Sequence, residues 1–456
     1  MSTTAPRSPQ GTPLSRAMRP LNQLVERYLP SALVFAIALT FVVSVMALVL
    51  TDAGPSDIVT EWGDGLAGLL AFMTQMALIL MLGHTLAHTR PVRRLLRLLG
   101  SVPRTALQAY VFVFLVAAVA SLVTWGLGLV VGALLAKEVA AQGREKGLAL
   151  HFPMLVAAGF SGFVVWHMGY SGSAPLTAAT PDSFISATLG TPLPVSETTF
   201  ATWNIIAAVV TIGVVAGALY LVAPRGDDRI IELAVDAREA DPAVATEVVT
   251  PADRVDASRL PTLALGLLLV VYLVLHFSGG GTLTLDIVNW SFLALILLLV
   301  SNPFELIALV KNAAANVGEI LLQFPLYAGI LGIMAGTGLI ELLSDALVSI
   351  AGPTTFGLLA FLSAGIVNFF VPSGGGQLAV QGPLLLDAAE KLGVDPAIAV
   401  MAVAYGDQWT NMIQPFWALP LLAIAGLRMR DILGYTTVTL LASGLVMGTT
   451  LVLVSL

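Results

Sequence analysis

The sequence of 456 residues contains no cysteine, and only 11% of its residues are charged. The missing cysteines exclude disulfide bonds, thiolate zinc sites and cysteine nucleophiles. A soluble domain carries about 25% charged residues, so the shortage of charge excludes an ordinary soluble protein. Outside its apolar runs the sequence offers no set of nucleophile, base and orienting residue, and no segment large enough for an enzyme domain. We therefore do not expect an enzyme.

Long apolar runs are what the sequence has in abundance, since 57% of its residues are hydrophobic. A helix of about 20 apolar residues is long enough to cross a bilayer. The polar stretch 1–30 is too long for the charged start of a signal peptide, so we expect the first apolar run to be retained as a helix. The runs lie at roughly 31–51, 65–88, 106–136, 148–175, 199–223, 262–278, 286–302, 321–341, 354–391, 396–420 and 432–456. This pattern predicts an all-α polytopic membrane protein.

Two of these runs, 106–136 and 354–391, are too long for one crossing, and each contains a glycine-rich break. The breaks read TWGLG at 124–128 and PSGGGQ at 372–377. If both runs are re-entrant hairpins, 20 of the 21 lysine and arginine residues face the cytoplasm and only Lys391 faces outward. If both are simple crossings, the polar loop 225–259 with its five arginines faces outward instead. The charge pattern therefore favours the hairpins, with nine further crossings, a cytoplasmic N-terminus and an outside C-terminus.

The two halves repeat the same order of elements, displaced by about 245 residues. Each half has a hairpin, then a charged turn, then an apolar run that polar residues and a proline interrupt, and this register aligns His167 with Asn411. Because the hairpins open to opposite sides, we predict an inverted-topology repeat of the kind found in secondary transporters. The expected units are a cytoplasmic tail 1–30, a first half 31–223 with hairpin 106–147 and broken helix 148–175, a linker 224–260, and a second half 261–456 with hairpin 354–391 and broken helix 396–420.

Broken helices at membrane depth leave backbone groups unpaired, which is tolerated only beside protein or a polar cavity. Two hairpin tips and two broken helices therefore predict one buried polar site. Helix N-termini at the breaks suit an anion, and glycine allows close approach of a ligand. The candidate substrate contacts are Trp125, Gly126, Gly128, His167, Ser171, Gly172, Ser373, Gly374, Gly375, Gly376, Gln377, Asn411 and Gln414. The candidate ion-coupling residues are Asp407 and Thr410, because an intramembrane carboxylate can bind a proton or Na⁺.

Each of these interpretations has a plainer alternative. PSGGGQ can be a loop outside the membrane, and TWGLG can be ordinary helix packing. His167 can be a neutral imidazole bonded within the bundle, and Asp407 a structural partner for a hairpin amide. A phosphate-binding loop is excluded because no GK[ST] follows the glycines. We expect no metal site, since the pair His84 and His88 lacks a third ligand.

Four stretches of the sequence resemble the bacterial short-chain fatty acid transporter family, and the similarity runs from about residue 17 to the end. They read FFVPSGGGQLAVQGP, AYGDQWTNMIQPFWALPLLAIAGLRMRDILGY, TWGLGLVVGALLAKE and HMGYSGSAPL. The resemblance implies uptake of butyrate- or acetoacetate-like carboxylates across the inner membrane. More distantly, it implies the ion transporter superfamily, with paired hairpins and an elevator-type transport domain. By analogy with elevator-type relatives, it also implies a homodimer.

The sequence places no arginine at membrane depth to pair with a carboxylate. Neutral donors and a co-bound cation must therefore offset its charge, which favours symport with Na⁺ or H⁺ and requires no other cofactor. The expected partners are a short-chain carboxylate and membrane lipid, not nucleic acid. A passive anion channel and a carrier for another organic anion remain open, although a dicarboxylate would require a second anion clamp. A membrane enzyme is disfavoured by the missing catalytic set.

Overall fold

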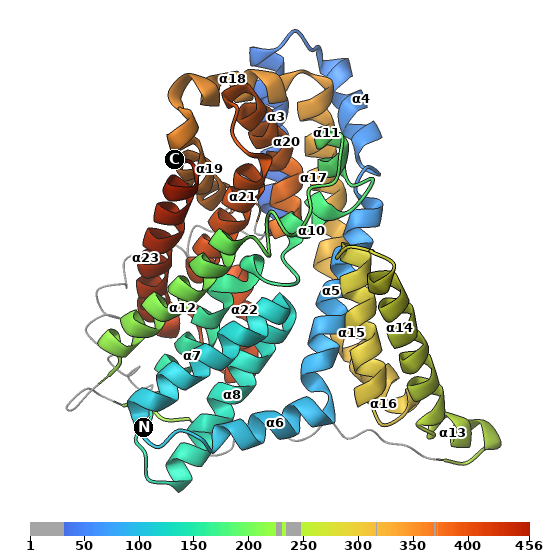
Figure 1. The fold of residues 1–456 in the computed structure, drawn as a ribbon, viewed down its shortest axis with the longest axis vertical. Coiled ribbons are helices and arrows are strands. Elements are labelled where there is room, and N and C mark those ends of the chain that lie inside the picture. The colour runs from blue at the N-terminus through green and yellow to red at the C-terminus, as the bar shows by residue number, and fades with distance from the viewer. Residues whose placement is uncertain (1–31, 225–229, 234–247, 316, 369–370, 372) are drawn as a thin grey trace, which may run out of the picture.

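A computed structural model describes residues 32–224, 230–233, 248–315, 317–368, 371 and 373–456. Within these ranges every regular element is a helix, as Figure 1 shows. The helical segments long and apolar enough to cross a membrane are Leu70–His88, Ala106–Val123, Trp125–Glu145, Phe152–Ala179, Thr202–Val222, Leu260–Ser278 and Met429–Val454. Shorter apolar helices lie at Ala36–Leu50, Leu285–Leu299, Ile320–Gly336 and Pro353–Val367. The all-α architecture expected from the apolar runs is confirmed, and the predicted tail 1–30 lies outside the described residues.

One group of helices comes from the start of each half of the chain. In it α17 packs on α3 and α4, α5 packs on α15 and α16, and α14 packs on α15 (Figure 1). The bounds are α3 Ala32–Leu50, α4 Pro55–Gly65, α5 Leu70–His88, α14 Leu260–Ser278, α15 Leu285–Leu299, α16 Pro303–Ala314, α17 Gly318–Gly336 and α18 Leu339–Ile350. Only 11% of the apolar window of α14 is buried. Its exposed apolar surface suits contact with lipid.

The second group contains both predicted hairpins and both interrupted runs. Its bounds are α7 Ala106–Val123, α8 Trp125–Glu145, α9 Phe152–Ser161, η1 Gly162–Met168, α10 Ser173–Ala179, α11 Phe184–Leu189, α12 Thr202–Val222, α19 Pro353–Val367, α20 Gly374–Leu392, α21 Pro396–Thr410, η2 Asn411–Ile413, α22 Pro415–Ala425 and α23 Met429–Val454. The apolar window of Phe152–Ala179 is entirely buried. The first interrupted run is therefore the centre of the molecule.

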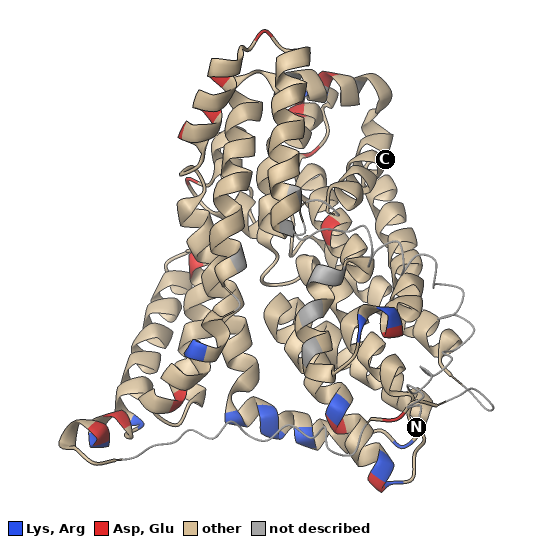
Figure 2. Ribbon diagram, turned by 180° about the vertical axis from the view of Figure 1, so that it is seen from behind, with Lys and Arg blue, Asp and Glu red and all other residues tan. Residues whose placement is uncertain are grey.

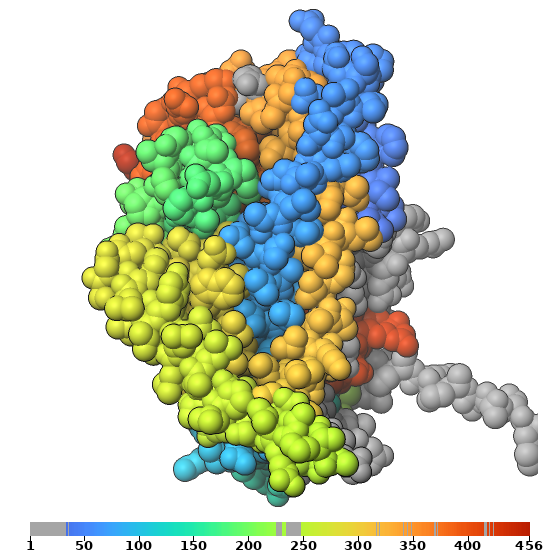
Figure 3. Space-filling view, turned by 90° about the vertical axis from the view of Figure 1, so that its right-hand side faces the viewer, coloured from blue at the N-terminus to red at the C-terminus, as the bar shows by residue number. Residues whose placement is uncertain are grey.

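Two short helices border these groups. The amphipathic helix α6, Arg90–Gly100, runs across the lower end of the molecule between α5 and α8 (Figure 1). Its Arg90 forms an ion pair with Glu305 of α16 at 3.3 Å. Helix α13, Pro251–Asp256, precedes α14. In Figure 3, α14 and α15 stand beside α5 on one face of the molecule.

The two predicted helix breaks are present, but their glycines lie inside helices. The break between α7 and α8 is the single residue Thr124, whose extended backbone (φ −157°, ψ 139°) lets α8 begin at Trp125. Ser373 is the N-cap of α20, so the three glycines that follow form its first turn. Both interrupted runs contain the predicted irregular backbone: η1 and a turn precede α10, and η2 precedes α22, which starts at Pro415. Proline at the first helical position suits such a restart because its missing N–H would be unpaired there anyway.

Glycines bring the backbones of the second group into direct contact. A Cβ added to Gly132 of α8 would lie 2.8 Å from the carbonyl oxygen of Gly159 in α9, and one added to Gly159 would lie 2.7 Å from that of Gly132. A Cβ on Gly169 would lie 2.2 Å from the carbonyl oxygen of Leu122 in α7. In the second half, a Cβ on Gly406 of α21 would lie 2.5 Å from the carbonyl oxygen of Phe361 in α19. Small residues at such positions allow close helix packing in membranes.

Candidate functional site

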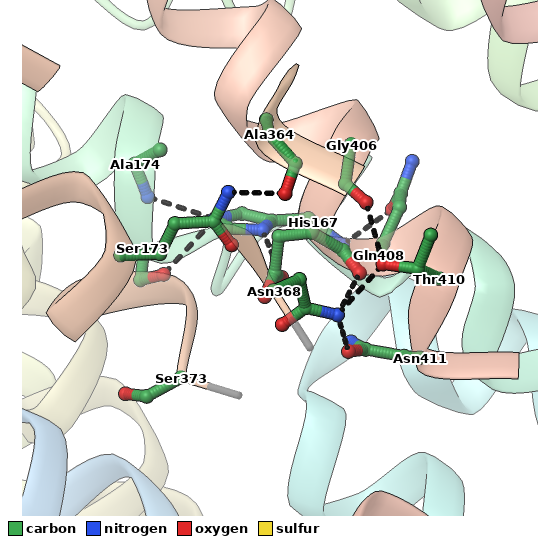
Figure 4. A network of polar contacts seen from close by, with 12 residues as sticks. His167, Ser173, Ala174, Ala364, Asn368, Ser373, Gly406, Gln408, Thr410 and Asn411 are labelled. Carbon is green, nitrogen blue, oxygen red and sulfur yellow. Dashed lines mark hydrogen bonds and ion pairs between the residues drawn. The ribbon is translucent and has the colours of Figure 1, made fainter. Parts of the chain in front are cut away.

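The two interrupted runs meet at a buried pair of ionisable side chains. Nδ1 of His167, in η1, lies 2.9 Å from Oδ2 of Asp407, in α21, and both side chains are fully buried. The backbone N–H of His167 also donates to Oε1 of Gln408 at 2.9 Å. Figure 4 shows this network around His167. The two residues are 240 positions apart in the chain, so the pair joins the two halves at their centre.

The contacts of the second ring nitrogen fix the tautomer of His167. Nε2 accepts a hydrogen bond from the backbone N–H of Ala174 at 2.9 Å, and Oγ of Ser173 lies 2.9 Å from the same atom. A backbone N–H can only donate, so Nε2 must keep its lone pair. The proton of a neutral imidazole is then on Nδ1, where it donates to the Asp407 carboxylate. His167 is therefore neutral in this structure.

The order Ser173, His167 and Asp407 matches that of a hydrolase triad. In a hydrolase the lone pair on Nε2 must be free to take the serine proton. Here the Ala174 N–H shares that lone pair, and all three triad side chains are buried. The geometry suits a histidine held within the fold, not an activated serine nucleophile.

Asn368 is the centre of the polar network in the second half. Its side-chain amide donates to the backbone oxygen of Asp407 at 3.0 Å, to Oγ1 of Thr410 at 3.0 Å and to Oδ1 of Asn411 at 2.6 Å. Figure 4 shows these bonds converging on Asn368. Gln414 donates to the backbone oxygen of Asn368 at 3.4 Å. Our sequence reasoning missed Asn368, although a lone amide in the apolar run before the second break was a usable signal.

The start of α20 lies directly on the His167 ring. A Cβ added to Gly374 would lie 2.7 Å from Cε1 of His167 and 2.7 Å from Oγ of Ser173. Gln377 donates to the backbone oxygen of Ala364 at 2.8 Å. Ser373 accepts from the backbone N–H of Gly376, and Figure 4 shows its side chain pointing away from the His167 network.

Aromatic residues from α8 and both interrupted runs form a cluster beside this network. Trp125, the first residue of α8, lies edge-on to Trp417 of α22, with ring centroids 5.3 Å apart. Trp166 stacks on His167 at 4.0 Å with 16° between the planes, and its ring centroid is 6.3 Å from that of Trp125. Phe163 stacks on Trp166 at 5.7 Å. These four residues, Trp125, Phe163, Trp166 and Trp417, are the aromatic cluster.

Several buried polar atoms around this centre have no hydrogen-bond partner in the part of the chain that the structure describes. The donors include Nε1 of Trp166, Nδ2 of Asn411 and the hydroxyl groups of Ser121, Thr124 and Ser171. The acceptors include Oδ1 of Asn368 and Oε1 of Gln377. A buried polar group without a partner costs about 1–3 kcal/mol. Unpaired donors and acceptors beside one ionisable pair therefore indicate a place for a polar ligand.

The structure brings together only some of the residues singled out from the sequence. His167, Asp407, Thr410, Asn411, Gln414 and Gly374 belong to one contact network, and Ser171 and Gly172 are in the turn that follows His167. Trp125 belongs to the aromatic cluster. Gly126 lies against α5, Gly128 against Ser121, Gly375 against Phe72 and Gly376 against Tyr327, so these glycines serve helix packing. Among the described residues, no three histidine, aspartate or glutamate side chains form a metal-binding group.

Comparisons with known proteins agree over nearly the full length of the chain. The sequence profile of the family described as short chain fatty acid transporter matches residues 13–454. An Escherichia coli (strain K12) protein named as a candidate short-chain fatty acid transporter is 42% identical over 436 residues, covering 95% of this chain and 98% of its own. A protein of Haemophilus influenzae with the same name is 37% identical, covering 94% of this chain and 97% of its own.

Two solved structures share the fold. The YdaH transporter of Alcanivorax borkumensis superposes with a TM-score of 0.60 at 17% identity, covering 92% of this chain and 98% of its own. MtrF of Neisseria gonorrhoeae, described with a class of antimetabolite efflux pumps, superposes with a TM-score of 0.55 at 16% identity, covering 95% of this chain and 97% of its own. At these identities the likeness shows the fold alone. The family profile and the sequence relatives carry the assignment, and they are transporters, not enzymes. The chain belongs to the short-chain fatty acid transporter family.

Proposed function

We propose that the protein is a secondary active transporter that imports short-chain fatty acids across the bacterial inner membrane by cation symport. The observation that carries the proposal is the His167–Asp407 pair, buried where the two interrupted runs and the second hairpin tip meet. A fully buried ionisable pair inside a membrane protein is a default candidate for an ion or substrate site. The names of the sequence relatives supply the substrate class.

We further propose the arrangement expected from the sequence: re-entrant hairpins, an inverted repeat and an elevator-type movement. Support comes from the matching order of α7 to α10 and α19 to α22, each with a helix pair followed by an interrupted run. The orientation rests on charge. Figure 2 shows lysine and arginine gathered toward the end of the molecule where α6 lies, whereas Lys391 bonds to Asp345 of α18, at the other end. By the positive-inside rule, the α6 end is cytoplasmic. The C-terminus, in the half away from α6 (Figure 1), is then outside.

The site offers separate partners for the two ends of a short fatty acid. The indole N–H of Trp166 and the hydroxyl of Ser171 are buried donors without a partner among the described residues, and both lie within four positions of His167. We assign the carboxylate to these donors. The alkyl tail then lies on the aromatic cluster, whose rings offer apolar area without a second charge. Among the described residues of the network none is a lysine or arginine, so a dicarboxylate would leave one carboxylate buried and unpaired.

Counterflow in proteoliposomes tests the carrier mechanism. Vesicles preloaded with unlabelled butyrate are expected to accumulate labelled butyrate transiently, because a carrier exchanges substrate faster than it returns empty. Protein-free vesicles correct for diffusion of the neutral acid. An open channel gives no such overshoot and would contradict the proposal. Competition by acetoacetate but not by a four-carbon dicarboxylate is the expected specificity.

The absence of native cysteine permits a direct test of the second hairpin tip. In Ser373→Cys, labelling by a water-soluble thiol reagent is expected to slow when butyrate occupies the neighbouring site. By mass action, butyrate at 100 times its Kd leaves about 1% of sites empty, so labelling slows up to about 100-fold if only empty protein reacts. Ser56→Cys, at the exposed start of α4 and outside the apolar spans, is the control and should label at an unchanged rate. Equal labelling of Ser373→Cys with and without butyrate would place the site elsewhere.

A further inference from the structure

His167 has one position at which it can gain a proton. Nδ1 already holds a proton and donates it to Asp407, and Nε2 accepts from the Ala174 N–H. A proton on Nε2 would face that N–H, so the bond from Ala174 must break before His167 can become an imidazolium. Ser173 must also turn its hydroxyl, since an imidazolium Nε2–H can only donate. Protonation of His167 is thus coupled to rearrangement of the turn between η1 and α10.

We propose that His167 is the proton carrier of the transporter and, once protonated, the counter-ion of the substrate carboxylate. This inference rests on the proposed function and goes beyond it by naming the coupling ion and its residue. One proton from the outside binds Nε2, and one carboxylate binds the resulting Nε2–H, with Asp407 stabilising the imidazolium from the other side. The apolar runs contain no arginine to pair with the carboxylate. His167 takes that role, and it carries a positive charge only while the substrate is bound.

The charges balance in both forms of the site. The empty pair consists of a neutral imidazole and the Asp407 carboxylate, with a net charge of −1. The loaded site holds the Asp407 carboxylate, an imidazolium and the substrate carboxylate, which also sum to −1. Because a proton and an anion enter together and leave together, the buried charge does not change. Loaded and empty carriers then face the same electrostatic barrier in the bilayer, and transport moves no net charge.

Among the described residues, the other titratable groups on the elements packed against η1 either bond elsewhere or lie away from the His167 ring. Of the elements packed against η1, α21 contributes Asp407, and its Tyr405 bonds to Asn204 of α12. Tyr110 of α7 accepts from the backbone N–H of His151. Lys137 of α8 bonds to the backbone oxygen at the end of α22. The charges of α20, Asp387, Glu390 and Lys391, lie in its last turns, whereas the His167 ring meets its first residue.

The rest of the His167 environment fits a group that is alternately neutral and charged. Trp166 stacks on the ring at 4.0 Å, and the face of an indole attracts a cation. Gly374 lies so close to the ring that any Cβ there would collide with it. The hairpin tip therefore covers the imidazole, and access to Nε2 depends on its movement.

Proton uptake on substrate binding is the measurement that tests this proposal. Butyrate is titrated calorimetrically into the purified full-length protein near neutral pH, in two buffers of different ionisation enthalpy. The difference in heat gives the number of protons taken up per bound butyrate. We expect close to one for the wild type. A value near zero with butyrate bound overturns the proton assignment but leaves a carboxylate carrier intact, whereas no binding of butyrate contradicts the proposed function itself.

Two variants locate the proton. His167→Gln should bind butyrate at least tenfold more weakly and take up no proton. His151→Gln is the matched control, because His151 is buried at the start of α9, where its Nδ1 accepts from the backbone N–H of Ile231. It should retain an uptake near one, and loss of uptake in this variant instead would overturn the assignment to His167. In wild-type proteoliposomes, accumulation of butyrate driven by an imposed membrane potential or a Na⁺ gradient, with no pH gradient, would also overturn it.

Discussion

Asp407→Asn is expected to lower butyrate uptake about 100-fold while the protein stays folded. The asparagine oxygen can still accept the Nδ1–H of His167, so the shape of the buried pair is kept. It cannot supply the negative charge that an imidazolium needs. Hydrogen bonds between charged groups are worth about 1.5–3 kcal/mol, against about 1 kcal/mol for neutral ones. Removing the carboxylate charge also changes the net charge of the loaded site. Each loss of about 1.4 kcal/mol is a tenfold effect, so two such losses give the expected 100-fold decrease in uptake.

Counterflow of labelled butyrate and size-exclusion profiles together check this expectation. Asp387→Asn is the matched control: Asp387 pairs with Lys391 at 2.6 Å, and Lys391 keeps its second partner Asp345 at 2.8 Å. Exposed ion pairs contribute about 0–1 kcal/mol, so this variant should transport at close to the wild-type rate. Normal transport by Asp407→Asn would show that the carboxylate only supports the structure.

Gly169→Ala is expected to prevent folding or to lower the melting temperature strongly. The new methyl group would lie 2.2 Å from the carbonyl oxygen of Leu122 and 2.6 Å from its Cα. These are backbone atoms, which cannot rotate away, and the same oxygen accepts from the N–H of Tyr170 at 2.7 Å. Overpacking of a well-packed core costs about 1–3 kcal/mol, and the loss of this backbone bond adds to it. The contact joins the first interrupted run to α7.

Thermal unfolding in detergent measures the effect. Gly213→Ala is the control, since Gly213 lies in α12 with no atom within 4 Å of an added Cβ. Alanine is favoured over glycine in a helix by about 1 kcal/mol, so this variant should be as stable as the wild type or slightly more stable. A Gly169→Ala protein that melts like the wild type would mean that the two segments separate easily.

The sequence predicted the helices well because their signal is local. Apolar runs of bilayer length and the prolines and glycines that interrupt them depend on nothing distant. The first predicted break, TWGLG at 124–128, contains the extended residue Thr124, but its two glycines already lie in α8. The reason is tertiary: Gly126 and Gly128 are small in order to pack against α5 and Ser121.

The central pair was harder to predict, since no local pattern links His167 with a residue 240 positions away. The internal repeat came close by aligning His167 with Asn411, one helical turn beyond Asp407. The role of Asn368 and the tautomer of His167 depend on which donors face which acceptors. Only the folded arrangement of the two interrupted runs supplies that information.

The glycine contacts also have a mechanical consequence. Gly132 against Gly159 and Gly169 against Leu122 join α7 and α8 to the first interrupted run, and Gly406 against Phe361 joins α21 to α19 in the second half. Where two backbones touch, no side chain can rotate to absorb a displacement. The first-half helices joined in this way should therefore move as one stiff unit, and α19 and α21 as another, whereas the contact between Gly374 of α20 and the His167 ring, which joins the two halves, is where they can separate. Because the units are stiff, a small displacement of a helix on one side of the site would be transmitted to the helices on the other side.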